Sequence, residues 1–180
     1  AAAAARLAAA VRGRLGSLGF ARAAFEILLE PAERSAAGAD RVQFLLASNP
    51  GEELRPLRLV ASSGEASRVM LAIKAALAAQ DRVPLLVFDE VDANVGGELA
   101  VRVGERLWEL ARSHQVLCIT HLPQVAARAE HHFRVEKEVV GERTTVRVEP
   151  VEGERRVAEL ARMLGGGPGA MEHARELAGQ

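Results

Sequence analysis

Residues 85–90 read Leu-Leu-Val-Phe-Asp-Glu, so four apolar residues are followed directly by two carboxylates. The apolar run is too short for a helix and suits a strand that is buried in a parallel sheet. Isolated charges are costly in such surroundings. The run therefore predicts a buried strand that delivers Asp89 and Glu90 to the edge of a sheet.

A second strand with a polar end is predicted one helix further along. Residues 97–112 carry apolar side chains at three- and four-residue steps, which predicts an amphipathic helix, and residues 116–119 form another apolar run. Strand, helix and strand make a β-α-β unit with a right-handed crossover and parallel strands, whose polar residues gather at the carboxyl edge. His121 follows the second strand, so we expect it beside the acidic pair.

A marked helix entrance precedes the acidic strand. Ser62, followed three residues later by Glu65, matches a capping box, and residues 63–80 repeat apolar side chains at helical spacing. A helix N-terminus with small residues exposes backbone N–H groups and a partial positive charge, which suit a phosphate oxygen. Ser62, Ser63, Gly64 and Glu65 are therefore candidate phosphate contacts, with an ordinary capped helix as the alternative.

The acidic pair suits metal-assisted phosphoryl chemistry. Neighbouring side chains of a strand point to opposite faces, so both carboxylates can serve one site only where the chain turns off the sheet. A divalent cation would give Asp89 a partner, and Glu90 could polarise a water for attack on a phosphoryl group. His121 could reach the terminal phosphate or that water. The alternatives are two solvated carboxylates that open a loop and a polar residue that ends a strand.

The remaining segments predict further helices and antiparallel strands. Helices are expected up to about residue 14 and at residues 154–164 and 171–177. Antiparallel strand pairs are expected at residues 25–30 with 42–47, and at residues 132–138 with 144–149 around Gly141. Residues 52–56 are expected to be a polar connection, and Met70 and Trp108 to lie in the core.

Composition limits the classes of protein. A chain of 180 residues that is 49% hydrophobic can bury a substantial core. A net charge of -1 gives no overall field toward nucleic acid or membrane, so any DNA contact must be local. Cys118, the single cysteine, lies in an apolar run and predicts a buried, reduced thiol. No membrane span or signal-peptide pattern occurs, so we expect a cytoplasmic chain without a membrane partner.

The order of these motifs resembles the C-terminal lobe of an ABC-type ATPase head, in which signature motif, Walker B strand, D-loop and switch histidine follow one another. Several stretches narrow the resemblance to the RecN family of SMC-like bacterial DNA-repair ATPases. They are residues 38–44 (Gly-Ala-Asp-Arg-Val-Gln-Phe), 48–51 (Ser-Asn-Pro-Gly), 87–92, 118–126 and 159–165. The resemblance extends from about residue 18 to residue 166.

The resemblance implies an α/β fold: the C-terminal lobe of an ABC/SMC-type P-loop ATPase head, with a mainly parallel sheet flanked by helices. Residues 1–17 would be the end of a coiled-coil helix or a low-complexity stub, and residues 18–180 would be the lobe itself. The sequence contains no Gly-x-x-x-x-Gly-Lys-Ser/Thr loop, which the family carries in an N-terminal lobe. Implied partners are that Walker A lobe, a second head in a homodimer, and DNA through the full-length protein, in double-strand break repair at the bacterial nucleoid.

The resemblance also implies a role for each candidate residue. Asp89 would belong to the Mg²⁺ shell, Glu90 would activate the attacking water, and His121 would be the switch at the γ-phosphate of ATP. Asp92 would lie in the D-loop at the interface between heads. Residues 62–65 would be the signature motif, which contacts the γ-phosphate of ATP bound to the opposing head.

Two positions depart from the family's pattern. Family members have Gly-Gly where this chain has Ser63 and Gly64, and leucine where it has Ala66. If the backbone at Ser63 needs a positive φ, its side chain costs energy and weakens the signature contact. A non-catalytic, structural head of a coiled-coil protein is therefore one alternative. The nucleotide-binding domain of another ABC-type ATPase, such as a membrane transporter, is another.

Overall fold

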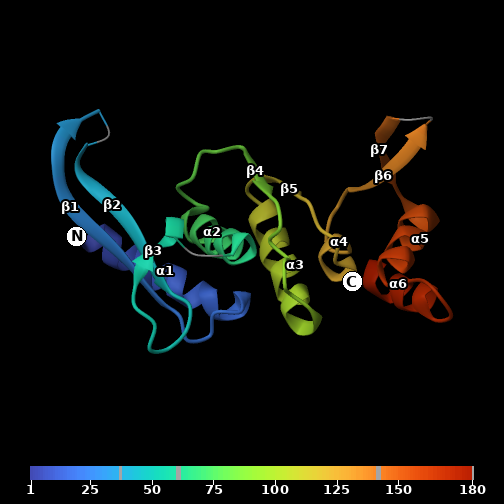
Figure 1. Ribbon diagram of the computed structural model, residues 1–180, viewed down its shortest axis with the longest axis horizontal. Coiled ribbons are helices and arrows are strands. Elements are labelled where there is room, and N and C mark those ends of the chain that lie inside the picture. The colour runs from blue at the N-terminus through green and yellow to red at the C-terminus, as the bar shows by residue number, and fades with distance from the viewer. Residues whose placement is uncertain (37, 60–61, 141–142, 180) are drawn as a thin grey trace. The chain divides into compact units, whose positions relative to one another are not determined.

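The computed structural model describes residues 1–36, 38–59, 62–140 and 143–179. The chain divides into two compact units, Ala1–Ile119 and Thr120–Gln180 (Figure 1). Across the described ranges, no helix is both long enough and apolar enough to cross a bilayer.

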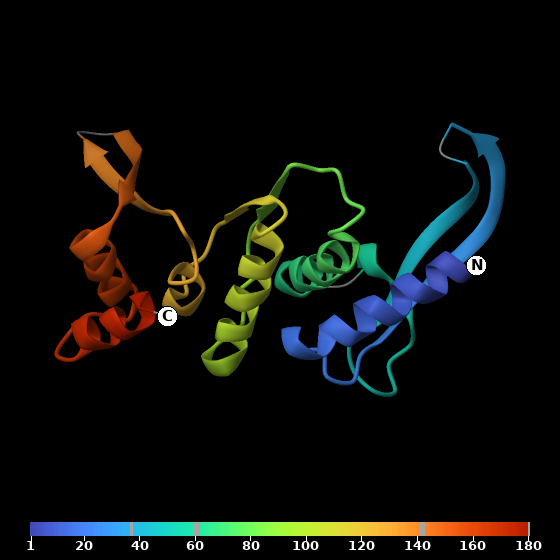
Figure 2. The ribbon, with the colours of Figure 1, turned by 180° about the vertical axis from the view of Figure 1, so that it is seen from behind.

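The first unit begins with a helix that lies along an antiparallel sheet (Figure 2). The elements are α1 (Ala2–Leu15), η1 (Gly16–Leu18), β1 (Ala24–Ser35), β2 (Gly38–Ala47) and β3 (Arg55–Pro56). The order in the sheet is β1-β2-β3. Arg12 joins α1 to the sheet, because its Nη1 donates to the carbonyl oxygen of Phe25 in β1 at 3.0 Å.

The predicted pairing of β1 with β2 is confirmed. The expectation that residues 52–56 are a polar connection is wrong in part, because Arg55 and Pro56 form β3, which pairs with Leu45 and Leu46 of β2. A strand of two residues that includes a proline leaves no alternating pattern for the sequence to reveal.

The predicted β-α-β unit follows in the same part of the chain. After η2 (Leu57–Leu59) and α2 (Ser63–Leu77) come β4 (Leu85–Phe88), α3 (Gly97–Ala111) and β5 (Gln115–Cys118). Strands β4 and β5 are parallel, with Leu85 opposite Gln115 and Phe88 opposite Cys118. The acidic strand and the strand that precedes the histidine are therefore neighbours, as the sequence predicts.

The two faces of the β4–β5 pair differ in burial. Leu86 and Phe88 are 7% and 5% exposed. The aliphatic side chains of the opposite face are about half exposed, at 46%, 58%, 49% and 56% for Leu85, Val87, Leu117 and Ile119. Parallel sheets are normally covered on both faces. Within the described residues, this second face, called the bare face below, is only about half covered.

The expectation of a mainly parallel sheet flanked by helices is wrong for this chain, although the α/β class is confirmed. Among strands of the described residues, β4–β5 is the one parallel pair, while β1-β2-β3 and β6–β7 are antiparallel. The reason lies in the connections. Consecutive strands joined by a short turn pair as hairpins, and a helical crossover such as α3 is needed for parallel pairing.

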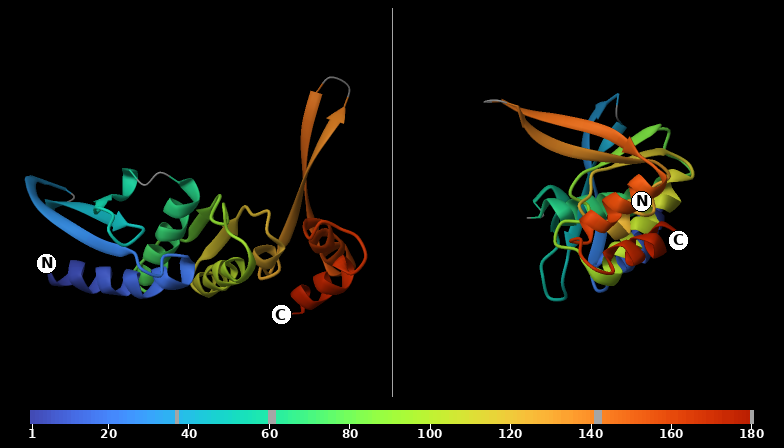
Figure 3. Two further views of the ribbon diagram at one scale, coloured as in Figure 1. Left: turned by 60° about the horizontal axis from the view of Figure 1, so that its bottom comes forward. Right: turned by 90° about the vertical axis from the view of Figure 1, so that its right-hand side faces the viewer.

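The second unit combines a hairpin with three helices. Its elements are α4 (Pro123–Ala126), β6 (His132–Val140), β7 (Arg143–Val151), α5 (Gly153–Met163) and α6 (Ala170–Ala178). The helices enclose a small core of Ala126, Leu160, Ala161 and Ala174. The hairpin extends away from α5 and α6 (Figure 3), and its pairing confirms the sequence prediction, although Gly141 lies outside the described residues.

Candidate functional site

The acidic pair lies where the chain leaves β4. Asp89 and Glu90 follow Phe88 directly, and both side chains are exposed. Glu90 has a φ of 56°, which lies in the left-handed region. Among the described residues other than glycine, only Asn94, at 57°, also has a positive φ. The chain thus turns off the sheet between the two carboxylates, as one shared site requires. A glutamate in this conformation is strained, which points to a functional role.

The first turns of α2 hold the loop of residues 89–94, which carries the acidic pair and is called the acidic loop below. The Ser67 hydroxyl donates to the carbonyl oxygen of Asp89 at 2.9 Å. Nη1 of Arg68 donates to the carbonyl oxygens of Ala93 at 3.1 Å and Val91 at 3.5 Å. Three backbone carbonyls of the loop are therefore fixed by side chains of one helix.

Arg68 is a buried cation that has little room to move. It is 8% exposed, and its guanidinium carbon lies 5.6 Å above the centre of the Phe20 ring. Burial lowers the pKa of Arg68 from its usual value, and the charge of Glu65 opposes this shift. A guanidinium held this way keeps its donors directed at the carbonyls of the loop.

Gly64 lets α2 approach the acidic loop closely. A Cβ atom at Gly64 would lie 2.8 Å from the Cβ of Ala93 and 3.1 Å from the carbonyl oxygens of Ala93 and Glu90. Ser63 is the first residue of α2 and is exposed, and its φ is not positive, unlike those of Glu90 and Asn94. The side chain of Ser63 therefore costs no backbone strain, and the position that requires glycine is Gly64.

The predicted helix cap is present at the same place. Ser62 is the N-cap of α2, and its Oγ accepts a hydrogen bond from the backbone N–H of Glu65 at 3.3 Å. This bond fixes where the helix begins. Ser62, Ser63, Gly64 and Glu65 therefore form a helix N-terminus, as the sequence predicts, and their contact with a phosphate stays a prediction.

Substituting Gly64 and Gly13, which lie in α2 and α1, is expected to give opposite results. Gly64→Ala should lower the free energy of unfolding by about 1–3 kcal/mol, because the new methyl group overlaps the Cβ of Ala93 and crowds two carbonyl oxygens of the acidic loop. Gly13→Ala, in α1, meets no atom within 4 Å and should raise it by about 0.5–1 kcal/mol. Urea unfolding of both variants measures the difference. Equal effects would show that α2 does not pack tightly on the loop.

Asp92 lies within this loop, and Cys118, the last residue of β5, lies close to it. Asp92 is 1% exposed, and its carbonyl oxygen accepts from the N–H of Val95 at 3.2 Å. The pKa of the Cys118 thiol is raised to about 12 by burial and, to a lesser degree, by the charges of Asp92 and Asp89. The thiol is therefore protonated and unreactive near neutral pH. The role of Asp92 at an interface between heads stays a prediction.

His121 belongs to the second unit. Its side chain is exposed, and the chain turns around it, because Thr120 Oγ1 accepts from the N–H of Leu122 at 3.0 Å. The acidic pair belongs to the first unit. The meeting of His121 with Asp89 and Glu90 therefore stays a prediction, which rests on the parallel register of β4 and β5.

The sequence patterns do not indicate that Ser67 and Arg68 hold the acidic loop. The signal was the spacing, since residues three and four positions after Gly64 lie on the same face of a helix as the glycine. Gly64, Ser67 and Arg68 thus share one face of α2. A small residue beside two hydrogen-bond donors indicates a helix that lies close to another segment of backbone and donates hydrogen bonds to it. The apolar periodicity of residues 63–80 concealed that face.

The donor set suits Mg²⁺ bound together with phosphates. Within the described part of the chain, no cluster of three or more His, Cys, Asp or Glu residues could hold a metal ion. Protein Mg²⁺ sites commonly use one or two carboxylates and complete the octahedron with water and substrate phosphates. Asp89, exposed at the end of β4, fits that arrangement as a single ligand.

Curated relatives of the chain are RecN DNA repair proteins. The RecN of Deinococcus radiodurans is 50% identical over 163 residues, which cover 89% of this chain and 28% of that protein. The RecN of Streptomyces coelicolor is 49% identical over 191 residues, covering 97% of this chain and 33% of that protein. The chain thus spans between 28% and 33% of the length of these relatives. No family model matches the chain.

Solved structures of SMC heads share the fold. The Smc head domain of Pyrococcus yayanosii, solved with a coiled coil and joint, gives a TM-score of 0.65 at 21% identity, over 88% of this chain and 29% of that chain. A structure described under ATP-driven dimerization and DNA-stimulated activation of SMC ATPases gives 0.55 at 15% identity, over 93% and 96%. At these identities the likeness shows the fold alone.

Proposed function

We propose that this chain is the C-terminal half of an ATP-hydrolysing head in DNA double-strand break repair. The premise is that its sequence is a partial RecN-type sequence and that its fold is the fold of an SMC head. The observation that carries the proposal is the acidic loop. Asp89 and Glu90 end β4 at the carboxyl edge of a parallel pair, where the chain turns with a φ of 56° at Glu90.

Each residue of the loop would have one task. Asp89 would hold Mg²⁺, which when bound neutralises charge on the transferred phosphoryl group. Glu90 would orient the attacking water and accept its proton, since an exposed carboxylate just past the metal ligand is placed to reach that water. His121 would donate to the γ-phosphate from the end of β5. Ser67 and Arg68 would keep the loop in place through its carbonyls.

The bare face of the β4–β5 pair supports an additional lobe as partner. Leu85, Val87, Leu117 and Ile119 are each about half exposed, at 46%, 58%, 49% and 56%. Covering such a face is worth roughly 25 cal/mol for each Å² of apolar surface removed from water. An N-terminal lobe with the Walker A loop would cover these side chains and bring the phosphate cradle to Asp89. Residues 1–17 would then be the end of the coiled-coil helix that joins the lobes.

The helix N-terminus at residues 62–65 supports a second head as partner. The first N–H groups of α2 lack carbonyl partners within the helix, and the helix dipole favours an anion there. Two heads in a symmetric pair would each present this end to the γ-phosphate of ATP on the other. Nucleotide binding and hydrolysis would close and open the dimer, and the full-length protein would hold DNA at the bacterial nucleoid.

Asp89→Ala in the full-length protein is expected to weaken ATP binding in Mg²⁺ by about tenfold or more, because the ion loses its carboxylate ligand. Calorimetric titration with ATP, in Mg²⁺ and then in EDTA, separates the part of the affinity that depends on the ion. Asp40→Ala, an exposed aspartate in β2, is the matched control and should change neither titration. Equal affinity of the Asp89→Ala and unmodified proteins in Mg²⁺ would remove Asp89 from this role.

A further inference from the structure

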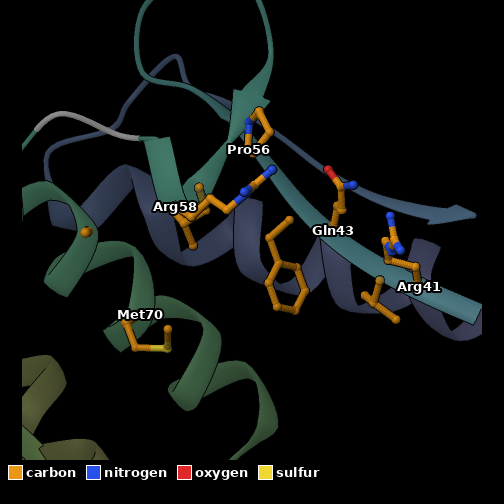
Figure 4. A pocket seen from close by; sticks show the side chains of 9 residues that line it. Arg41, Gln43, Pro56, Arg58 and Met70 are labelled. Atoms are coloured by element: carbon orange, nitrogen blue, oxygen red, sulfur yellow. The ribbon is translucent and has the colours of Figure 1, made fainter. Parts of the chain in front are cut away.

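A groove of about 640 Å³ lies beside β2 (Figure 4). It is bounded by β2 on one side, by β3 and η2 at one end, and by Ala66 and Met70 of α2 on the other side. None of the residues assigned above to ATP hydrolysis lines it. The proposed ATP hydrolysis therefore does not account for the groove.

The groove follows the free edge of a strand. In the sheet, β3 pairs with Leu45 and Leu46 of β2 and extends no further. Beyond that point, no strand of the described residues pairs with β2 on the side opposite β1. Residues 41–44 all line the groove. Because successive residues of a strand point to opposite faces, four in a row can line one groove only along the strand's edge.

The lining combines an apolar floor with two cations. Met70 is 41% exposed and Val42 is 54% exposed, and Phe44 and Leu57 are half-buried beside them. Arg41 and Arg58 also line the groove, and Figure 4 shows Arg41 beside Gln43 and Arg58 near Pro56. Neither guanidinium forms a hydrogen bond or ion pair with any part of the chain that the structure describes.

We propose that this groove binds an extended segment of a partner protein, in which acidic side chains flank apolar ones, as an added strand on the free edge of β2. Backbone N–H and C=O groups of β2 would pair with the segment, as in other complexes formed by strand addition. Alternate side chains of the segment would enter the apolar floor or meet Arg41 and Arg58. The occupant is thus defined by its backbone, its apolar residues and its carboxylates together.

A nucleic acid fits the groove less well than such a segment. Binding of nucleic acid depends on many cations that neutralise phosphates. Here Asp40 precedes Arg41, and Glu30 lies opposite Arg41 in the register of β1 and β2. The local excess of positive charge is therefore small and suits a few carboxylates. The exposed floor favours aliphatic side chains over a sugar-phosphate backbone.

The test uses the full-length protein and a fluorescent peptide of about nine residues that alternates valine and glutamate. Fluorescence anisotropy measures its affinity. Combined Arg41→Glu and Arg58→Glu substitutions are expected to weaken binding by about tenfold or more, because each attraction becomes a repulsion. Arg82→Glu changes an exposed arginine outside the groove and should alter the affinity less than about twofold.

Backbone methylation separates strand addition from simple side-chain docking. Two further peptides carry N-methyl groups on alternate residues, in the two possible registers, and only one register removes the N–H groups that face β2. One methylated peptide should lose binding by about tenfold or more, and the other should retain it. Three results would overturn the proposal: no binding of the parent peptide, equal behaviour of the two methylated peptides, or binding that survives the charge reversals. Loss of duplex DNA binding through the same reversals, with the peptide unaffected, would assign the groove to nucleic acid instead.

Discussion

Glu90→Gln in the full-length protein is expected to lower ATP turnover by at least about a hundredfold, with ATP affinity changed less than about twofold. The amide keeps the size of the side chain but cannot accept a proton from the attacking water. The loop itself should remain in place, because its fixed contacts come from the backbone carbonyls of Asp89, Val91 and Ala93. Steady-state phosphate release and nucleotide titration measure the two quantities.

The control for this experiment is Glu53→Gln, which changes an exposed glutamate in the connection before β3. It should leave both turnover and affinity unchanged. If Glu90→Gln hydrolyses ATP at the unmodified rate, another residue activates the water. If it loses affinity and turnover together, Glu90 contributes to binding of the nucleotide and not only to its hydrolysis.

The elements that the sequence predicts correctly are those with strong local periodicity. The apolar run of β4, the helical repeat of α3 and the run of β5 predict a β-α-β unit, and the structure confirms its parallel pairing. The cap at Ser62 is equally local, since it depends on one hydroxyl and the backbone three residues on. These features need no knowledge of the rest of the chain.

The features that the sequence does not reveal depend on contacts distant in sequence. The left-handed backbone at Glu90 and the close approach of Gly64 to Ala93 arise where α2 meets the acidic loop, more than a helix away along the chain. The sequence predicts that Met70 and Trp108 lie in the core, but the structure shows them 41% and 54% exposed. Hydrophobicity alone does not fix burial, because much of any protein surface is apolar.

The arrangement of the strands into sheets also depends on contacts that local sequence patterns do not reveal. The family resemblance implies a mainly parallel sheet, but this chain contains the parallel pair β4–β5 beside antiparallel sheets. Within the described residues, Val87 and Ile119 on the bare face of that pair are 58% and 56% exposed, and we propose a further lobe as its cover. Half of the proposed ATP site would likewise come from outside this chain.

The proposal has one central element: each ATP site combines the acidic loop of one head with the helix N-terminus of the other. Two full-length variants can separate these halves. Glu90→Gln disables the acidic loop. Ser63→Glu places a negative charge where the γ-phosphate of the opposing site would lie, while an acidic residue at this exposed first position of α2 is compatible with the helix.

The most direct measurement is therefore ATP turnover by an equal mixture of the Glu90→Gln and Ser63→Glu proteins. Each variant alone should be inactive. In a mixed dimer, one site would receive both defects and the other would receive none, so the mixture should recover about a quarter of the unmodified turnover if pairing is random. A mixture as inactive as its two components would show that the acidic loop and the helix N-terminus of a single head serve the same site, which contradicts the proposed arrangement.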